Sequence, residues 1–389
     1  MSTENRELSH LEQLRERFSA LKDPRVERTK LHELLDIITI AICAVICGAD
    51  DWVEMEQFGN DKREFFDKFL LLPNGIPSHD TFGRVFARLK PEEFQACFLE
   101  WVQDLVCASG GLLKGVIAID GKTLCGSRDS TSGKGAIQMV SAWAQENRMV
   151  LGAVKVDDKS NEITAIPQLL KLFDLSGCTV TIDAMGAQTA IAQAITDGGA
   201  EYVLSLKGNQ GTMHRDVIVM FEEATANEFK GISHQSEQTV EKGHGRIETR
   251  SYFLVDDPQY LGYLNPKGSW SGLRSIGMVQ SEREDGGVVS RESRYYLCSV
   301  GSVAEFREAA RGHWSIENGL HWVLDVAFRE DHNRAHIDHS AHNFAILRHI
   351  ALNLLKAEKS VKVGIKAKRL KCGWKESYML KVLLGPNPI

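Results

Sequence analysis

The chain has 389 residues, of which 43% are hydrophobic and 25% are charged, as in an ordinary globular protein. Its length predicts roughly two to three domains of about 100–200 residues each. The formal net charge of −6 argues against a uniformly basic nucleic-acid-binding protein. It does not exclude a local basic patch, because charges act within about a Debye length, roughly 10 Å.

The cysteines and the apolar runs indicate a cytoplasmic protein. The eight cysteines form no CxxC pair, which is typical of reduced thiols in the cytosol. The N-terminal string MSTENRELSH is polar and lacks a signal-peptide pattern. Residues 37–49 form the longest apolar run, which is shorter than the roughly 18–20 residues of a membrane-spanning helix. We therefore expect no membrane partner.

Residues 1–109 are expected to form a helical N-terminal domain. Helical periodicity marks four stretches, which are residues 34–47, 51–70, 79–89 and 91–106. Ser78 is the expected N-cap of the third helix. Arg84 and Arg88 lie four residues apart on that helix and point the same way. Such a helix either enters a DNA major groove or packs in the ordinary way, so this domain is a candidate DNA-binding unit.

Five apolar runs after Gly110-Gly111 have the length of strands: residues 116–120, 137–145, 149–156, 178–182 and 202–206. The first three follow one another without helices and should be antiparallel. Helical stretches separate the later ones, which should be parallel. This order predicts an α/β fold over residues 110–232, with a mixed sheet of the ribonuclease-H-like kind in which the first and fourth strands are neighbours.

Those two neighbouring strands each end in an aspartate that is followed by a small residue. Asp120 precedes Gly121, and Asp183 precedes Ala184. Either aspartate alone is better explained as a turn residue after a strand. On adjacent strands, however, the two carboxylates converge and can share one metal ion.

Residues 233–300 alternate like half-buried strands and are expected to form a β insertion. The runs are residues 235–242, 247–255, 273–281 and 290–300, and the string EDGG at residues 284–287 is a hairpin signal. Arg246 and Arg250 share one strand face because their spacing is even. They are candidate DNA contacts, and exposed charge on a sheet is the alternative.

Residues 301–389 are expected to hold the catalytic helix, the rest of the core and a basic C-terminal tail. Helical periodicity runs from residue 303 to residue 324, and Glu317 lies on this helix with His313 and His321 four residues to either side. Glu317 is the expected third carboxylate, and Asp325 is the alternative ligand. Between residues 356 and 381, nine basic residues face two acidic ones, which indicates either a DNA-binding patch or a solvated helical face.

Three converging carboxylates suit one kind of chemistry. Cutting or joining DNA displaces an oxygen at a phosphodiester, and two divalent ions about 3.5–4 Å apart activate the attacking group and stabilise the leaving oxygen. Mg²⁺ and Mn²⁺ prefer oxygen ligands. We therefore expect Asp120, Asp183 and Glu317 to bind two Mg²⁺ (or Mn²⁺) ions at the phosphates of double-stranded DNA.

Further candidate contacts lie beside these carboxylates in the sequence. Lys122 follows Asp120 and is either a contact to the scissile phosphate or a solvated lysine. Lys207 and Asn209 follow the fifth strand, on the rim where α/β sheets bind ligands. The histidines after residue 331 belong to no HExxH motif and have no cysteine nearby, so a zinc site is not expected.

Several uncommon strings occur in an order that resembles the H-repeat-associated branch of the DDE-type insertion-sequence transposases. They are IAIDGK at residues 117–122, SNEITAIPQLL at 160–170, TIDAMGAQ at 181–188, LKGNQG at 206–211, GHGRIETR at 243–250 and HWSIENGLHWVLDV at 313–326. Similar strings in the N-terminal region extend the resemblance from about residue 23 to residue 384. The resemblance implies a ribonuclease-H-like fold with Asp120, Asp183 and Glu317 as the catalytic triad.

One departure from the family pattern concerns the surroundings of Glu317. Related transposases place Tyr and Arg seven and four residues before this glutamate and Lys seven residues after it, where this chain has Ala310, His313 and Leu324. In the family, that lysine contacts a DNA phosphate. Its candidate replacements here are Arg311, His321 and Arg329.

The resemblance implies a bacterial, nucleoid-associated enzyme that cuts insertion-sequence ends by hydrolysis and uses the freed 3′ hydroxyl to attack target DNA. Its partners would be the element's terminal inverted repeats and the target DNA, bound by a homodimer on paired ends. Two alternatives stay open: a nuclease without strand transfer, and a catalytically silent or host-adopted DNA-binding relic. The three intact carboxylates argue against simple decay.

Overall fold

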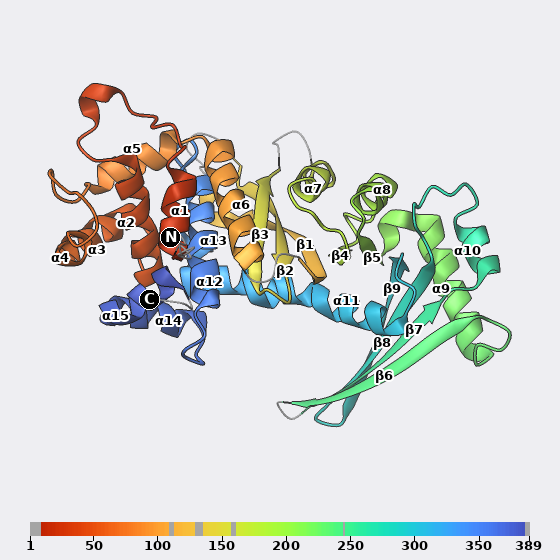
Figure 1. Ribbon diagram of the computed structural model, residues 1–389. Helices are drawn as coiled ribbons and strands as arrows, with labels where there is room; N and C mark the ends of the chain where they lie inside the picture. Colours follow the sequence, from red (N-terminus) through yellow and green to blue (C-terminus); the bar gives the residue numbers. More distant parts are fainter. Residues whose placement is uncertain (1–8, 109–112, 129–134, 157–160, 244–245, 386–389) are drawn as a thin grey trace, which may run out of the picture.

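The structure is a computed structural model that describes residues 9–108, 113–128, 135–156, 161–243 and 246–385 (Figure 1). Its centre is a nine-stranded mixed sheet in the order β3-β2-β1-β4-β5-β9-β8-β7-β6. Helices from both ends of the chain gather beside β3, and strands β6 to β9 project at the opposite end (Figure 1). The predicted domain boundary at Gly110-Gly111 lies outside the described residues.

The first part of the sheet follows the predicted order. β1 (Gly115–Leu124), β2 (Ile137–Ala144) and β3 (Met149–Lys155) are antiparallel neighbours. β4 (Cys178–Ile182) pairs in parallel with β1, and β5 (Glu201–Leu206) pairs in parallel with β4. The predicted adjacency of the first and fourth strands is therefore confirmed, together with the mixed α/β sheet.

The prediction that the first strand ends at Asp120 is wrong. β1 continues to Leu124, because β2 pairs with it along this whole stretch. An Asp-Gly pair signals a turn only where no neighbouring strand is present to hold the backbone extended. The parallel pairing with β4, in contrast, stops where Ile119 lies opposite Ile182. Asp120 follows Ile119 and Asp183 follows Ile182, so both aspartates lie where the parallel ladder between β1 and β4 ends.

Helices cover both faces of this sheet. α7 (Glu162–Leu170) and α8 (Thr189–Asp197) lie over one face, and α9 (Gly211–Ala226) follows β5 (Figure 1). The opposite face is covered by α11 (Val303–Ile316), which contacts β1, β4, β5 and β7. This one helix therefore touches both the early and the late strands of the sheet.

The strands expected in the β insertion are present. They are β6 (His234–Gly243), β7 (Arg246–Val255), β8 (Ser275–Asp285) and β9 (Val288–Cys298), with α10 (Pro258–Leu264) between β7 and β8. Because β9 pairs with β5, they continue the central sheet. Phe306 of α11 packs against Tyr252 and Tyr296 of these strands in a buried cluster, which fixes the helix on the insertion.

Six helices form the N-terminal part: α1 (His10–Phe18), α2 (Leu34–Cys47), α3 (Trp52–Asp61), α4 (Arg63–Phe66), α5 (His79–Arg88) and α6 (Pro91–Ala108). Ser78 caps α5 as predicted, since its side chain accepts a hydrogen bond from the N–H of Thr81. The single helix predicted over residues 51–70 is wrong. The chain breaks at Lys62 (φ −107°, ψ 18°), and this break lets Phe65 and Phe66 enter the core.

The last three of the four C-terminal helices pack against the buried helix α2, and the first of the four packs against the third. The four helices are α12 (Trp322–Phe328), α13 (Ser340–Ala357), α14 (Ile365–Trp374) and α15 (Glu376–Leu384). Arg369 of the basic tail is buried, donates hydrogen bonds to the carbonyl groups of Val45 and Ala49, and lies 3.0 Å from a carboxylate oxygen of Asp50. The exposed cations of the tail are Lys359, Lys362, Lys366, Lys375 and Lys381. The tail is therefore partly a structural element.

None of the helices in the described part of the chain combines the length and the apolar composition that a membrane span requires.

Gly312 lets α11 lie close to β1, because a Cβ atom there would come 2.8 Å from Cγ1 of Val116. We predict that Gly312→Val lowers the free energy of unfolding by about 1–3 kcal/mol, since overpacking pushes the helix off the strand. Urea denaturation measures this loss. Gly301→Ala is the matched control, because no described atom lies within 4 Å of a Cβ at that position. Equal losses in the two variants would contradict the close approach of helix and strand.

Candidate active site

Asp120 and Asp183 lie at the same end of the parallel ladder, but the backbone holds them differently. Oδ1 of Asp120 accepts a hydrogen bond from the N–H of Gly121 (2.9 Å). Oδ1 of Asp183 accepts hydrogen bonds from the N–H groups of Met185 and Gly186 (3.1 and 3.2 Å), which orders the loop after β4. These backbone bonds involve only one oxygen of each carboxylate.

The helix that carries Glu317 is interrupted at the site. α11 ends at Ile316, a π-helical turn spans Glu317–His321, and α12 follows. Residues 303–324 are helical as predicted, but they are not α-helical throughout. A π-helical turn is wider than an α-helical one and is frequent at functional sites. Here it directs Glu317 and His321 to the same side of the helix.

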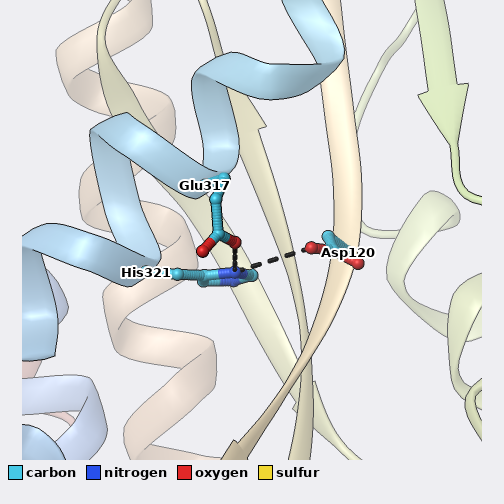
Figure 2. A group of neighbouring side chains, drawn as sticks. All are labelled: Asp120, Glu317 and His321. Carbon is cyan, nitrogen blue, oxygen red and sulfur yellow. Dashed lines mark hydrogen bonds and ion pairs between the residues drawn. The ribbon is translucent and has the colours of Figure 1, made fainter. Parts of the chain in front are cut away.

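Figure 2 shows that Asp120, Glu317 and His321 meet in space. Nδ1 of His321 lies 3.3 Å from Oε2 of Glu317 and 3.5 Å from Oδ2 of Asp120. One oxygen or nitrogen atom from each of these residues lies within 4.8 Å of the other two, a spacing that suits a shared cation. Among the described residues, Asp183 is not a member of this group.

A cavity of about 560 Å³ connects Asp183 to the same site. Asp120, Asp183 and Glu317 all line it, so the structure brings the three predicted carboxylates to one cavity. Lys207 and Arg294 also line it, and the wall therefore carries charges of both signs. This set of donors fits divalent cations next to an anionic ligand.

Burial raises the pKa of Asp120 from 3.8 to about 7, against the effect of the hydrogen bond from Gly121. Three nearby carboxylates add to the increase: Asp183, Glu162 and Glu317. A cation bound here would favour the ionised form of Asp120 and offset the repulsion between the carboxylates.

Two histidines on the catalytic helix flank Glu317. Nδ1 of His313 lies 3.3 Å from Oγ1 of Thr181 on β4, whereas the ring of His321 faces Asp120. Burial lowers the pKa of both histidines, and this effect outweighs the attraction of the nearby carboxylates. Both rings are therefore neutral at neutral pH.

Lys122 and Asp325 form an ion pair beside the site. Nζ of Lys122 lies 2.6 Å from each carboxylate oxygen of Asp325 and 4.0 Å from Glu330, which Arg348 contacts at 3.5 Å. The side chain of Lys122 is only 12% exposed. Lys122, the predicted phosphate contact, is thus paired with Asp325, the alternative metal ligand. Glu317 is the carboxylate that faces Asp120.

The other predicted contacts lie in different places. Lys207 lines the carboxylate cavity, and Asn209 donates a hydrogen bond to a carbonyl group of the loop after β4. His321, predicted as a DNA contact, is 5% exposed and faces the carboxylates instead. Arg84 and Arg88 line a separate hollow of about 630 Å³ between α5 and residues 333–340.

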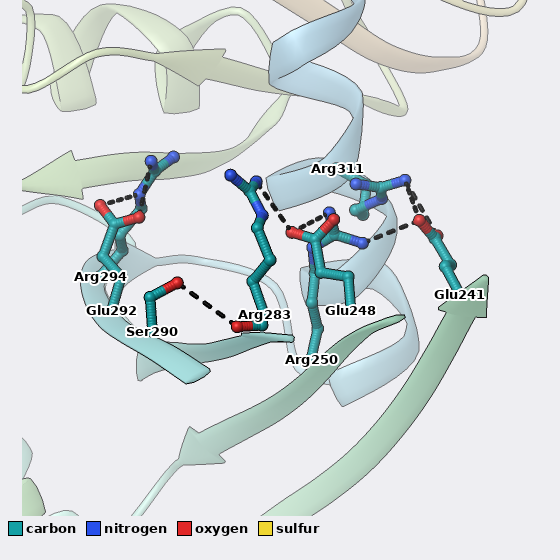
Figure 3. A network of polar contacts seen from close by, with 8 residues as sticks. All are labelled: Glu241, Glu248, Arg250, Arg283, Ser290, Glu292, Arg294 and Arg311. Atoms are coloured by element: carbon teal, nitrogen blue, oxygen red, sulfur yellow. Dashed lines mark hydrogen bonds and ion pairs between the residues drawn. The ribbon is translucent and has the colours of Figure 1, made fainter. Parts of the chain in front are cut away.

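Arg246, Arg250 and Arg311 line a hollow of about 520 Å³ between the β insertion and α11. Glutamates already contact two of these arginines (Figure 3). Glu241 lies 2.9 Å from Arg250 and 3.0 Å from Arg311, and Glu248 also pairs with Arg250. An anionic ligand must therefore compete with these glutamates for the arginines.

This arginine hollow adjoins the carboxylate cavity. Arg294 and Trp314 line both spaces, and the guanidinium carbon of Arg294 lies 4.9 Å from the centre of the Trp314 ring. The two hollows therefore form one continuous path, along which a bound polyanion can extend from the arginines of the insertion to the carboxylates.

Sequence reasoning did not assign Glu162 or the pair of Arg294 and Trp314. Glu162 begins α7, and its carboxylate group lies where a Cβ atom at Gly121 would be, so Glu162 lies directly beside the residue that follows Asp120. The string at residues 160–170, which includes Glu162, is one of those that resemble the insertion-sequence transposases. This resemblance was the available signal that Glu162 lies near the site. Arg294 and Trp314 lie on different elements, and no spacing in the sequence relates them.

Comparison with known families identifies the class of protein. A model of the transposase DDE domain matches residues 111–354, and a model described as "DDE_Tnp_1-associated" matches residues 15–102. The first match includes Asp120, Asp183 and Glu317. The chain belongs to the DDE transposase family.

The curated relatives place it within this family. The chain is 41% identical over 378 residues to the "Putative transposase YncI" of Escherichia coli O157:H7, a match that covers 96% of this chain and 95% of that protein. It is 39% identical over 381 residues to the "H repeat-associated putative transposase YhhI" of Escherichia coli strain K12, which covers 96% and 98%. These matches confirm the predicted H-repeat-associated branch.

Two further matches are weaker. The "Inactive transposase YbfQ" of Escherichia coli strain K12 is 40% identical over 80 residues, which cover 21% of this chain and 95% of that protein. A solved structure of the piggyBac transposase in a synaptic complex with hairpin DNA matches 98% of this chain and 79% of that chain at 11% identity. Its TM-score of 0.38 is too low to support an inference.

The raised pKa of Asp120 has a consequence for stability. The folded state holds a proton on this carboxyl up to about pH 7, whereas the unfolded state releases it near pH 4. Ionisation of Asp120 therefore costs stability as the pH rises through this window. We predict that Asp120→Asn raises the free energy of unfolding at pH 8, by on the order of 2 kcal/mol, with a smaller gain at pH 5.

Urea denaturation in EDTA at the two pH values measures this effect. Asp174→Asn is the control, because hydrogen bonding to Ser176 lowers the pKa of Asp174. Removing this carboxylate should not raise the free energy of unfolding at either pH. If Asp120→Asn gave the same gain at pH 5 and at pH 8, the stabilisation would not come from ionisation of this carboxyl.

Proposed function

We propose that the protein is an active DNA transposase that cuts insertion-sequence ends and joins them to target DNA in the presence of Mg²⁺ or Mn²⁺. The meeting of Asp120 and Glu317 beside one cavity that Asp183 also lines carries this proposal. The match to the transposase DDE domain supports the same class of reaction. We further propose that the central sheet is a ribonuclease-H-like core with residues 233–300 inserted in it.

Asp120, Asp183 and Glu317 would hold the cations. Divalent ions at these carboxylates would supply positive charge to the attacking group and the leaving oxygen. The side chain of Glu317 is 54% exposed and that of Asp120 is 26% exposed, so the DNA phosphate approaches from the side of Glu317. Lys207 and Arg294 on the cavity wall attract that phosphate and orient it.

Two displacements at phosphorus make up the reaction. In the first, a water molecule attacks the phosphodiester at the end of the element, the bond from phosphorus to the 3′ oxygen breaks, and this oxygen takes up a proton. In the second, the freed 3′ hydroxyl attacks a phosphodiester of the target and gives up its proton. A new bond from phosphorus to oxygen joins element and target, and a target 3′ hydroxyl leaves. Because both steps are the same substitution, one set of carboxylates serves both.

The DNA would follow the arginine hollow to the carboxylate cavity. Arg246, Arg250 and Arg311 would bind the phosphate backbone, and Arg294 lies where the two spaces adjoin. We propose that residues 1–109 provide a second DNA contact. A homodimer would hold the paired ends, in the bacterial nucleoid.

We predict that Asp120→Ala, Asp183→Ala and Glu317→Ala each reduce Mg²⁺-dependent cleavage of element ends to below about one-thousandth of the wild-type rate, because each removes a cation ligand. DNA binding in a gel-shift assay should be largely retained. Asp325→Ala is the matched control, since Asp325 pairs with Lys122, and it should cleave. Normal cleavage by Glu317→Ala together with none by Asp325→Ala would overturn the assignment of the third ligand.

The decisive assay for function incubates the purified protein with labelled element ends and a plasmid target, with Mg²⁺ or with EDTA. Joined products that require Mg²⁺ support the transposase. Cleaved ends without joined products indicate a nuclease, and intact DNA that is bound but not cut indicates a relic.

The glutamates that contact the arginines give a separate prediction. Glu241→Gln removes the anion shared by Arg250 and Arg311, and we expect DNA affinity to rise by about twofold to tenfold at low salt, since each exposed ion pair contributes about 0.2–1 kcal/mol. Fluorescence anisotropy over a series of salt concentrations measures the affinity, and its salt dependence should become steeper. Glu228→Gln is the control, because Glu228 pairs with Lys230 outside the hollow. An unchanged affinity and salt slope in Glu241→Gln would remove this hollow from the DNA path.

A further inference from the structure

The ring of His321 occupies an unusual position among the carboxylates. It is 5% exposed, and a single nitrogen atom, Nδ1, faces both Glu317 (3.3 Å) and Asp120 (3.5 Å) (Figure 2). The other ring nitrogen, Nε2, is buried and has no hydrogen-bond partner among the described residues. A buried polar atom in this situation costs free energy unless something else satisfies it.

Resting on the proposed function, we propose that His321 is a metal ligand through Nδ1, so that one cation is held by Asp120, Glu317 and His321. The site then has two carboxylates and one imidazole in place of oxygen ligands alone. This gives it a preference for Mn²⁺ over Mg²⁺, because imidazole suits transition-metal ions better than it suits Mg²⁺.

The separation from Nδ1 to Glu317 allows a hydrogen bond, and the separations to both carboxylates also suit a shared cation. A charge-assisted hydrogen bond between an imidazolium and a carboxylate measures about 2.7–2.9 Å, and both separations at Nδ1 are longer. Two ligand atoms that each lie about 2.1 Å from a shared ion are about 3.0–3.5 Å apart, depending on the angle at the ion. The separations from Nδ1 to Glu317 and to Asp120 lie in this range.

A second buried histidine interacts electrostatically with His321 without forming a hydrogen bond to Nε2. His349 of α13 is 3% exposed, and its Nδ1 also has no hydrogen-bond partner among the described residues. His321 acts on it electrostatically, although burial is the main reason that the pKa of His349 is low. Metal-binding histidines commonly donate their second N–H to a neighbouring acceptor. A cation at Nδ1 of His321 would leave the proton on Nε2, and no described residue accepts a hydrogen bond from Nε2.

An unprotonated Nδ1 and two carboxylate oxygens are three acceptors that face one another. They repel without a positive charge between them, and a cation is the group that makes this arrangement favourable. Lys122 does not take this role, because its ammonium group is bound to Asp325.

Mn²⁺ binding to the full-length protein without DNA tests the inference. Pulsed electron paramagnetic resonance detects a ¹⁴N nucleus that is bound directly to Mn²⁺, and the wild-type protein should show this coupling. His321→Gln should lose the coupling and bind Mn²⁺ at least about tenfold more weakly. His321→Asn should also lose the coupling but keep more of the affinity, since its amide oxygen reaches close to the position of Nδ1.

His332→Gln is the matched control, because His332 is exposed, and it should bind Mn²⁺ like the wild type. Competition by Mg²⁺ should be weak in the wild type and stronger in His321→Gln. Mn²⁺ that binds the wild type without ¹⁴N coupling, and binds His321→Gln with equal affinity, would overturn the role of His321 and leave the carboxylate site intact. A wild-type protein that binds no Mn²⁺, even with DNA ends present, would overturn both this inference and the proposed function.

Discussion

The close approach of acidic side chains at the end of the β1–β4 ladder is the constraint on which the rest of the structure depends. Asp120 and Asp183 follow directly after the last parallel pair, and the π-helical turn adds Glu317 from the opposite side. Burial and mutual repulsion make this arrangement unfavourable for ionised carboxylates, as the raised pKa of Asp120 shows. The sheet and the helix α11 hold these groups together.

The β insertion extends this site without forming a separate body. Its strands join the central sheet through β5 and β9, and α11 packs against both the core strands and the insertion. The arginine hollow is therefore packed against the helix that leads into Glu317. The glutamates within the hollow partly neutralise its arginines. A chain with a net charge of −6 can therefore still hold a local group of arginines that binds an anionic partner. Binding of a polyanion would exchange these internal ion pairs for external ones.

Much of this arrangement could be predicted from the sequence, because it depends on strand order. Alternating runs and helical stretches predicted the adjacency of the first and fourth strands. Four features depend on tertiary contacts and could not be read locally. β2 extends β1 beyond Asp120, the π-helical turn interrupts the catalytic helix, Lys122 is bound to Asp325, and Arg369 of the basic tail is buried against α2. For β1, Lys122 and Arg369, a distant segment supplies the partners that the local sequence pattern does not show.

The most direct test of the central claim is the position of Mn²⁺ in crystals of the protein with an element end, located by anomalous scattering. The account predicts density between the carboxylates of Asp120, Asp183 and Glu317, next to a DNA phosphate. Ions bound elsewhere, with Asp183 or Glu317 turned away from them in the DNA complex, would contradict it.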